Sequence, residues 1–496
     1  MRQVENTLDS EATSRTSFPA AEQALIDPSA IALLVPDGVG FRNFVFGNFL
    51  QKAKRLGRIH LFHLVEDDRL PPEALEGNEA VRWHRLLPFK ERPLPFFLRH
   101  TLMTAQRFWI NTPPNLSAAN RPASGSIQRR AAMTLARWAG RASASPRQIR
   151  RLERVHSIVM GRSPEVAYFR RILERIRPDI VFSSNQNPLF VIAPVLAAKQ
   201  LGIPTATFVF SWDNLSTKGR IAAPFDHFLV WSDHMKQELR RFYPDVSQER
   251  AHIVGTPQFD CYADKDLLWS RAEFCRRIGA DANLPLVCFS GGDAGVSKGD
   301  HLHVRVLMEL IRSGKVHGRP QVLLRPAPSD AGTRYDSVRA DFPELIYAPP
   351  AWIRSKSPHG EYFGLMPSAD DVQILANITF HANLNINFAS TMTLDFAIRN
   401  KPVINAMFEV TDPPLFGNSM REFLRGFGHY DPVVDLGAAR FAHTPEELAE
   451  HMNAYLRDPT LDGEGRRRFV ELEVGVPIGR SSDRVVEVLR AIARGS

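Results

Sequence analysis

The sequence predicts an α/β fold made of two domains, each built on a parallel β-sheet. Short apolar runs are followed by segments with apolar residues at helical spacing, and this strand–helix alternation repeats along the chain. A polar stretch at residues 263–285 interrupts the alternation and is typical of a connection between domains. The length of 496 residues is sufficient for two such domains, each with its own core.

The chain begins with a polar segment, residues 1–28, which mixes charges and lacks the apolar centre of a secretory signal. We expect a disordered tail there. No run of about 18 apolar residues follows, so no membrane span is expected. The three cysteines form no CxxC pair and the histidines no HExxH motif, which predicts a cytoplasmic protein without a metal site or a disulfide. We expect no bound cofactor.

The first domain is expected over residues 29–262. Its strands are predicted at residues 31–36, 59–65, 180–184, 203–210, 227–232 and 252–260, and its helices at 44–57, 166–177, 188–202 and 233–243. Residues 85–165 form an insertion, in which 111–126 is typical of a flexible loop and 127–141 of a basic amphipathic helix.

The insertion lies within a strongly basic region. Residues 82–177 hold 19 arginines and one lysine against four glutamates, a balance of +16 that leaves −8 for the rest of the chain. Such a region favours an anionic partner, and we expect an anionic membrane surface or a lipid-linked diphosphate rather than nucleic acid. Arginines that are simply solvated on helix faces are the alternative.

The second domain is expected over residues 286–480, after a helical linker at 263–285, and residues 481–496 form a C-terminal helix. Its strands are predicted at residues 286–290, 321–326, 345–350, 384–389 and 403–405, and its helices at 301–314, 333–343, 368–379 and 392–399. No short-period internal repeat occurs.

Polar residues are concentrated in loops that follow the predicted strands. Because the carboxyl ends of parallel strands form one edge of a sheet, these loops are expected to line a cleft between the two domains. The first domain contributes Asp37, Gly38, Gly40, Arg42, Asn43, Asn185, Trp212, Asp213, Asn214 and Lys218. The second contributes Ser290, Gly291, Gly292, Arg325, Ser390, Thr391 and Asp395.

Asp213 is the candidate general base, since the apolar Trp212 beside it is expected to raise its pKa and Lys218 can supply a counter-charge. A turn at Asp213 and Asn214 is the alternative. Arg325 ends an apolar strand and suits bidentate phosphate binding, with a structural salt bridge as its alternative.

Three hydroxyl residues, Ser390, Thr391 and Thr393, begin the helix at 392–399 and suit an anion such as a diphosphate, while Asp395 can accept a ribose hydroxyl. Ordinary helix capping is the alternative. The loop from residue 37 to 43 is expected to bring backbone N–H groups to a ligand, although it lacks the third glycine of a dinucleotide fingerprint.

Four of these loops together resemble a known family. WDNLSTKG, VGTPQFD, LLRPAP and NFASTMTLDFA follow one another between residues 212 and 397. They are similar, in the same order, to motifs of the CDP-glycerol glycerophosphotransferase-like proteins and, more broadly, of GT-B glycosyltransferases of bacterial surface polysaccharide synthesis. The resemblance implies two Rossmann-like domains facing each other across a cleft.

The resemblance also implies roles for single residues. Arg325 matches the family's phosphate-binding arginine, Ser390 and Thr391 match its diphosphate-binding serines, and Asp395 its acid. Asp213 stands where the family has its proposed catalytic histidine, and Ala327 replaces a second histidine that contacts the donor phosphates. The departures favour a nucleotide sugar as co-substrate.

The expected function is therefore metal-independent transfer of a sugar from a nucleotide-sugar donor to a glycan or lipid-linked acceptor, at the inner membrane face. A non-hydrolysing nucleotide-sugar 2-epimerase, a polyol-phosphate transferase, a nicotinamide-dependent enzyme and a non-catalytic nucleotide-sugar or polyanion binding protein are the alternatives.

Overall fold

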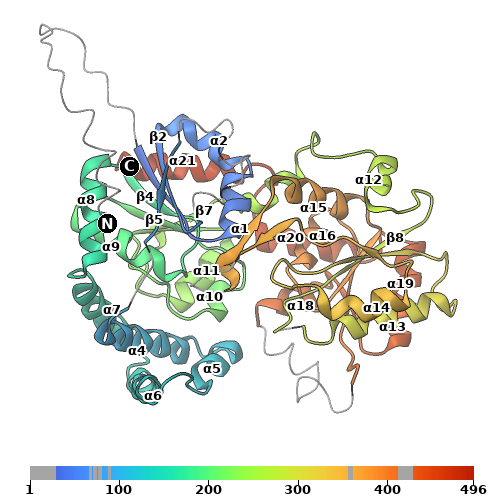
Figure 1. Cartoon of the computed structure of the whole chain (residues 1–496), viewed down its shortest axis with the longest axis horizontal. Helices are drawn as coiled ribbons and strands as arrows, with labels where there is room; N and C mark the ends of the chain where they lie inside the picture. Colours follow the sequence, from blue (N-terminus) through green and yellow to red (C-terminus); the bar gives the residue numbers. More distant parts are fainter. Residues whose placement is uncertain are drawn as a thin grey trace, which may run out of the picture.

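Figure 1 shows two α/β domains side by side, with the blue-to-green half of the chain in one and the yellow-to-orange part in the other. The computed structural model describes residues 30–65, 70, 75, 81–87, 91–295, 297–355, 361–411 and 428–495. The expected N-terminal tail lies outside these residues. The predicted α/β fold with two parallel sheets is confirmed.

The first sheet has seven parallel strands in the spatial order β3-β2-β1-β4-β5-β6-β7. They are Ala30–Val35 (β1), Arg58–His63 (β2), Val81–Arg85 (β3), Ile180–Ser183 (β4), Thr205–Phe208 (β5), His227–Val230 (β6) and Ala251–Ile253 (β7). β1, β4 and β5 are buried at every position, which explains why β1 and β4 are mostly apolar rather than alternating, whereas β5 is buried although Thr205 and Thr207 alternate with apolar residues. The strand order reverses between β1 and β4, and ligands of such sheets bind at this switch point.

Helices cover both faces of this sheet. They are α1 (Gly38–Gly40), the π-helical turn η1 (Phe41–Val45), α2 (Phe49–Ala53), α8 (Pro164–Ile176), α9 (Ile192–Gln200), α10 (Asn214–Thr217) and α11 (Asp233–Phe242), with short 3-10 turns at Lys54–Leu56, Leu189–Val191 and Gln248–Arg250.

The insertion between β3 and β4 is a group of four helices, α4 (Pro93–Ile110), α5 (Pro113–Asn120), α6 (Ile127–Ala142) and α7 (Pro146–Met160), at the edge of the first domain (Figure 1). The flexible loop expected at residues 111–126 is wrong for half of its length, because α5 occupies Pro113–Asn120. The prolines of α5 are tolerated in a first helical turn, and Thr112 and Asn115 both donate to the Ser216 carbonyl at 2.6 Å. Within the described residues, no helix is long and apolar enough to cross a membrane.

The second sheet has six parallel strands in the order β10-β9-β8-β13-β14-β15, with its switch point between β8 and β13. They are Leu286–Ser290 (β8), Gln321–Arg325 (β9), Ile346–Tyr347 (β10), Leu384–Asn387 (β13), Val403–Ala406 (β14) and Arg440–Ala442 (β15), beside a hairpin of Trp352–Arg354 (β11) and Leu365–Pro367 (β12). The helices are α13 (Asp300–Arg312), α14 (Asp336–Asp341), α15 (Ala369–His381), α16 (Met392–Ile398), α18 (Asp431–Asp435), α19 (Pro445–Arg457) and α20 (Gly463–Val474), with 3-10 turns at Thr333–Tyr335, Glu361–Gly364 and Gly428–Tyr430 (η9).

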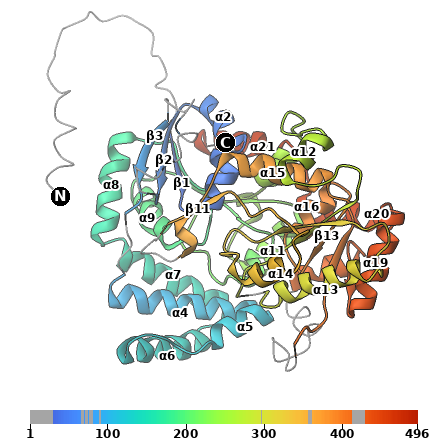
Figure 2. The same cartoon turned by 45° about the vertical axis from the view of Figure 1, so that its right-hand side comes forward.

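The chain crosses between the domains twice. It leaves the first sheet through the 3-10 helix η6 (Pro257–Tyr262) and α12 (Arg271–Ile278), so the segment expected to be helical throughout is helical only in α12. It returns after α20, and α21 (Ser481–Ala493) packs on the first domain beside α2 (Figure 2). The Asp260 carboxylate accepts the backbone N–H groups of Ser481 and Ser482 at 3.0 and 2.8 Å, which fixes the point of return.

A pair of acidic side chains, Glu238 on α11 and Glu473 on α20, lies where these two helices meet across the domain boundary. Burial, with a contribution from the charge of Asp213, raises the pKa of Glu238 to about 8. Burial, with a contribution from Glu238, raises the pKa of Glu473 to about 8. His234 Nε2 lies 3.9 Å from Glu473 Oε1. Both carboxyl groups are therefore largely protonated at neutral pH.

Candidate functional site

The loops that follow the strands of both sheets meet at the domain boundary. Gly38, just after β1, lies so close to β12 of the second domain that an added Cβ would overlap the Leu365 carbonyl oxygen. Trp212, after β5, packs its ring edge-on against His429 and Phe469 of the second domain at 5.3 and 5.7 Å between ring centroids. The predicted loops are thus brought together, but direct packing fills part of the space between them.

The turn after β1 is held by Asp37. One carboxylate oxygen accepts the Gly40 N–H at 2.8 Å, and the other accepts Nδ2 of Asn185 at 2.8 Å. Burial raises the pKa of Asp37 above its ordinary value despite these bonds. The expected presentation of backbone N–H groups to a ligand is not what this turn does, because Gly38 packs against β12 and the Gly40 N–H is bound by Asp37.

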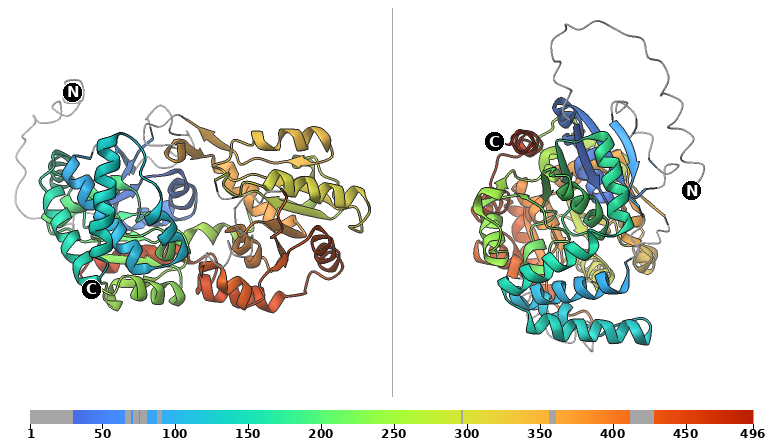
Figure 3. Two further views of the ribbon diagram at one scale, coloured as in Figure 1. Left: turned by 90° about the horizontal axis from the view of Figure 1, so that it is seen from below. Right: turned by 90° about the vertical axis from the view of Figure 1, so that its left-hand side faces the viewer.

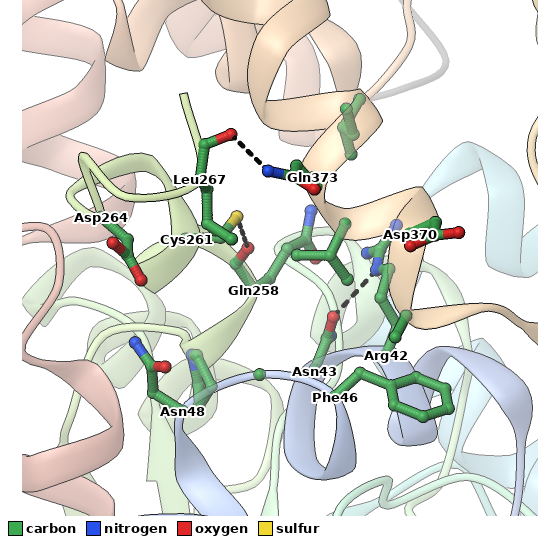
Figure 4. Close-up of a pocket in the computed structure, with 15 residues that line it drawn as sticks. Arg42, Asn43, Phe46, Asn48, Gln258, Cys261, Asp264, Leu267, Asp370 and Gln373 are labelled. Atoms are coloured by element: carbon green, nitrogen blue, oxygen red, sulfur yellow. Dashed lines mark hydrogen bonds between the residues drawn. The ribbon is translucent and has the colours of Figure 1, made fainter. Parts of the chain in front are cut away.

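Arg42 and Asn43, in η1, line a cavity of about 280 Å³ between the first domain, the linker and α15 (Figure 4). Arg42 Nε donates to Asn43 Oδ1 at 3.0 Å. Asn43 is only 2% exposed, and its Nδ2 has no hydrogen-bond partner among the described residues. Gln258 and Gln373 lie across the cavity, so its lining is rich in amide groups.

Asp213 lies after β5, and its Oδ2 accepts the hydroxyl of Thr217 at 3.0 Å. Burial alone would raise the pKa of Asp213. The charges of His429 and Lys218, with hydrogen bonds from Ser211 and Thr217, lower it instead. The increase expected from an apolar wall is therefore wrong, and Asp213 is a carboxylate at neutral pH.

His429, in η9 of the second domain, is a site residue that the sequence analysis missed. It interacts electrostatically with Asp213 of the first domain. Burial lowers the pKa of His429, with Asp213 opposing the shift, so a neutral imidazole faces a carboxylate across the boundary. Nothing in the sequence around His429 marks it, because its partner is in the other domain.

The amides near Asp213 form a second polar group. Asn187 Nδ2 donates to Asn214 Oδ1 at 3.4 Å, whereas Nδ2 of Asn214 is buried without a partner among the described residues. Lys218, at the end of α10, is exposed. Asn214 and Lys218 thus lie with Asp213, whereas Asn185 belongs to the turn after β1.

Arg325 ends β9 and is 6% exposed. Its Nη2 donates to Asp371 Oδ1 at 2.8 Å, and the Asp371 carboxylate also accepts the Ala351 N–H at 2.9 Å and Trp352 Nε1 at 2.7 Å. The structural salt bridge is therefore present. Nη1 of Arg325 remains buried without a hydrogen-bond partner in the described ranges, so one terminal nitrogen of the guanidinium is not satisfied by the protein.

Ser390 and Thr391 follow β13 at the switch point of the second sheet, and both are partly exposed. Ala389, before them, adopts a left-handed conformation with φ 44°, and its N–H donates to Asn405 Oδ1 at 2.9 Å. The Ser390 N–H donates to Asn387 Oδ1 at 3.0 Å. Buried amides therefore position the turn, and Ser390 Oγ accepts the Met392 N–H at 3.3 Å, so the ordinary capping role is present.

Asp395, one turn into α16, is 2% exposed, and one of its oxygens accepts the hydroxyl of Tyr262 from η6. Burial raises the pKa of Asp395 to about 6, opposed by the positive charges of Arg42 and Arg325. Two arginines from different domains thus lie close enough to act on one carboxyl group. In this arrangement Asp395 holds the linker and does not face the cleft.

The loop after β8 is closed by contacts within its own domain. The Gly291 N–H donates to the Arg325 carbonyl at 2.9 Å, and the Gly292 N–H to Asp300 Oδ2 at 2.7 Å. Ser290 Oγ accepts Nδ2 of Asn385 at 2.7 Å. Ser290, Gly291 and Gly292 lie at the switch point, but these groups are already engaged.

Comparison with solved structures identifies the arrangement of the domains. The glycosyltransferase from Rickettsia africae ESF-5 is similar with a TM-score of 0.50 at 12% identity, over 95% of this chain and 100% of that chain. The UDP-GlcNAc 2-epimerase from Neisseria meningitidis bound to UDP-GlcNAc has a TM-score of 0.51 at 9% identity, over 93% and 99%. The GT-B-like fold is confirmed.

The wall teichoic acid polymerase TagF is also similar, with a TM-score of 0.49 at 10% identity over 94% of this chain and 89% of that chain. No protein-family model and no curated protein matches the sequence. Among the described residues, no three His, Cys, Asp or Glu side chains are placed to hold a metal ion together.

Proposed function

We propose that the protein is a glycosyltransferase that moves a sugar from a nucleotide-sugar donor to a glycan or lipid-linked acceptor in bacterial surface polysaccharide biosynthesis. The observation that carries the proposal is the buried guanidinium of Arg325 at the carboxyl end of β9, on the same sheet edge as Ser390 and Thr391, which follow β13 on the other side of β8. A positively charged fork and two hydroxyl groups at one edge of the same parallel sheet suit a diphosphate.

Asp213 is connected to this point through side chains of the second domain. It interacts with His429, and the neighbouring Tyr430 shares a 2.6 Å hydrogen bond with Thr393, two residues after Thr391. The proposed donor and the proposed base therefore belong to one region of the domain boundary, as the transfer reaction requires.

In the proposed reaction, the acceptor hydroxyl attacks the anomeric carbon of the donor sugar while its proton passes to Asp213. The bond from the sugar to the nucleoside diphosphate breaks, and the leaving diphosphate carries the negative charge. Arg325 and Arg42 stabilise this charge, and no metal ion takes part. His429, neutral at pH 7, is placed to share the proton with Asp213.

Calorimetric titration with UDP, GDP, CDP and dTDP tests the donor site, with Arg325→Ala as the control. Binding of one nucleotide by the wild type and its loss in the variant are expected. Binding of none would remove the basis of the proposal. With an acceptor, Asp213→Asn should cut turnover by roughly 10²–10⁴-fold and leave nucleotide affinity intact.

A nucleotide-sugar 2-epimerase is the second candidate, and the pairing of His429 with Asp213 is the observation that favours it. Inversion at a sugar carbon needs groups that remove and return a proton, and this pair supplies two. Incubation with UDP-GlcNAc in the absence of any acceptor distinguishes the two functions. A new epimeric sugar nucleotide in the NMR spectrum would support the epimerase, whereas unchanged donor supports the transferase.

We propose a cytoplasmic location at the inner membrane face, where the basic region at residues 82–177 holds the enzyme near a lipid-linked acceptor.

A further inference from the structure

Helix α6 carries its large apolar side chains on the face that points away from the protein. Ile127, Leu135 and Trp138 are 76%, 62% and 68% exposed. At 3.6 residues per turn these three positions lie along one side of the helix, together with Ala131 and Ala142, and they span about three turns.

The buried side of α6 is made of small residues. Ala136 and Gly140, four residues apart, are the buried positions and face α4. A Cβ added to Gly140 would lie 2.7 Å from Cβ of Thr104 and 2.8 Å from the Thr101 carbonyl oxygen, so the two helices are in close contact. The packing of α6 against α4 thus does not use the large apolar residues of α6, which remain exposed.

Arginines border the apolar stripe. Arg130 and Arg141 are exposed on one side of it, and Arg137 lies one turn away from Arg141 on the same side. Residues 93–160 contain eleven arginines and one acidic residue, Glu153. Glu153 is engaged by Arg220 of the first domain at 2.7 Å, on a part of α7 that faces the protein, so the helical insertion presents a mainly positive surface.

We propose that α6 docks the protein on the surface of an anionic lipid bilayer, with the helix lying in the plane of the interface. Figure 2 shows α6 at the lower edge of the molecule, with α4 between it and the rest of the first domain, and the right-hand view of Figure 3 shows the teal helices of the insertion at the same edge. The helix can therefore contact a flat surface along its whole length. Its Trp138 and aliphatic residues insert among the lipid chains while the arginines bind the phosphate head groups.

The apolar stripe decides between a bilayer and a nucleic acid. A nucleic acid is held through its phosphates and stacked bases, and leucine and isoleucine side chains along three helical turns add little to such contacts. A bilayer contacts both the apolar stripe and the arginines that border it. The inference concerns the placement of the protein near a lipid-linked acceptor and so extends the proposed function, but the docking itself does not depend on the reaction.

Flotation with phosphatidylcholine vesicles, with and without phosphatidylglycerol, tests the docking. The wild type should float only with the anionic vesicles, and less at high salt. The double variant Leu135→Ser with Trp138→Ser should lower the vesicle partition coefficient by about tenfold or more. Arg130→Gln should lower it by about fivefold, the equivalent of ~1 kcal/mol per basic residue.

Two matched control substitutions lie outside the helical insertion. Val434→Ser removes another exposed apolar side chain, 53% exposed, and Arg490→Gln another exposed arginine, and both should float like the wild type. Because every changed residue is exposed, all variants should unfold at nearly the same temperature as the wild type. An unchanged partition coefficient in the α6 apolar variant would overturn the proposal, and so would equal flotation with neutral vesicles.

A single-stranded RNA homopolymer provides the alternative partner. Retention of the RNA through Arg130, together with no flotation, would assign α6 to nucleic acid instead. Nucleotide titration of the same variants separates this inference from the proposed function: binding of a nucleoside diphosphate should be unchanged by the α6 substitutions, and its absence in the wild type would count against the transferase alone.

Discussion

Replacing Arg325 with lysine is expected to weaken nucleotide binding much more than folding. In the wild type, Nη2 of Arg325 holds Asp371 while Nη1 lacks a hydrogen-bond partner among the described residues. Lysine keeps one positive charge for Asp371 but has no second planar nitrogen. Loss of one charge-assisted hydrogen bond to a phosphate, about 1.5–3 kcal/mol, corresponds to a roughly 10–150-fold increase in Kd.

The stability of the variant can be bounded from the same contacts. Asp371 keeps the hydrogen bonds from the Ala351 N–H and Trp352 Nε1 and still faces a cation, so the free energy of unfolding should fall by no more than about 1.5 kcal/mol. Asp371→Asn is the matched control. It leaves both terminal nitrogens of Arg325 in place but removes the buried counter-charge, and should cost about 3–5 kcal/mol.

Calorimetric titration with the nucleotide that binds the wild type, alongside urea unfolding of all three proteins, checks both numbers. Arg325→Lys should bind the nucleotide weakly and have near-normal stability. Asp371→Asn should instead lose much more stability than nucleotide affinity. An Arg325→Lys protein that binds as tightly as the wild type while remaining folded would refute the role of Nη1.

Three further predictions concern other groups. The pKa of Glu238 is raised from 4.5 to about 8, so the stability it contributes is fully present below pH 4.5 and is lost as pH rises through 8. The pKa of Glu473 is raised to about 8 as well, so in melting curves taken from pH 5 to 9 Glu238→Gln should reduce this dependence and leave the part due to Glu473. Glu238 interacts with Glu473, Asp213 and Arg241. A pH dependence of stability that the substitution leaves unchanged would contradict the raised pKa of Glu238. Because the pKa of Asp213 is lowered, protonation of this group should not reduce the rate of the proposed transfer near pH 6. A decrease of the rate near pH 6 that is absent in Asp213→Asn would contradict the lowered pKa. Gly38→Ala should lower the melting temperature by several degrees, since its Cβ would displace β12, and unchanged melting would mean that the domains open easily at this point.

The strands and most helices could be predicted because their signals are local. β1 and β4 lie between two helical layers, and their burial on both faces produces apolar runs that can be recognised in the sequence. Polar residues after the strands, such as Asp213, could be assigned to the domain boundary because parallel strands end at one edge.

The rest depends on contacts between distant segments. α5 has the Pro, Asn and Ser content of a loop and is ordered by bonds to Ser216, far along the chain. The pKa of Asp213 depends on His429, and the burial of Asp395 on Tyr262. The outward-facing residues of α6 could be recognised as an amphipathic pattern, but only the packing of Gly140 against α4 shows which face is exposed.

The double crossing of the chain has a mechanical consequence for how the two domains move. A single linker would allow rotation about many axes, whereas two connections, through η6 and through the segment before α21, leave mainly rotation about the line that joins them. Asp260 clamps both connections together by binding the backbone of Ser481 and Ser482, which places them on one short axis. This arrangement predicts a hinge with one preferred direction of opening, in which residues far from the axis, such as those of the second sheet's outer strands, move furthest.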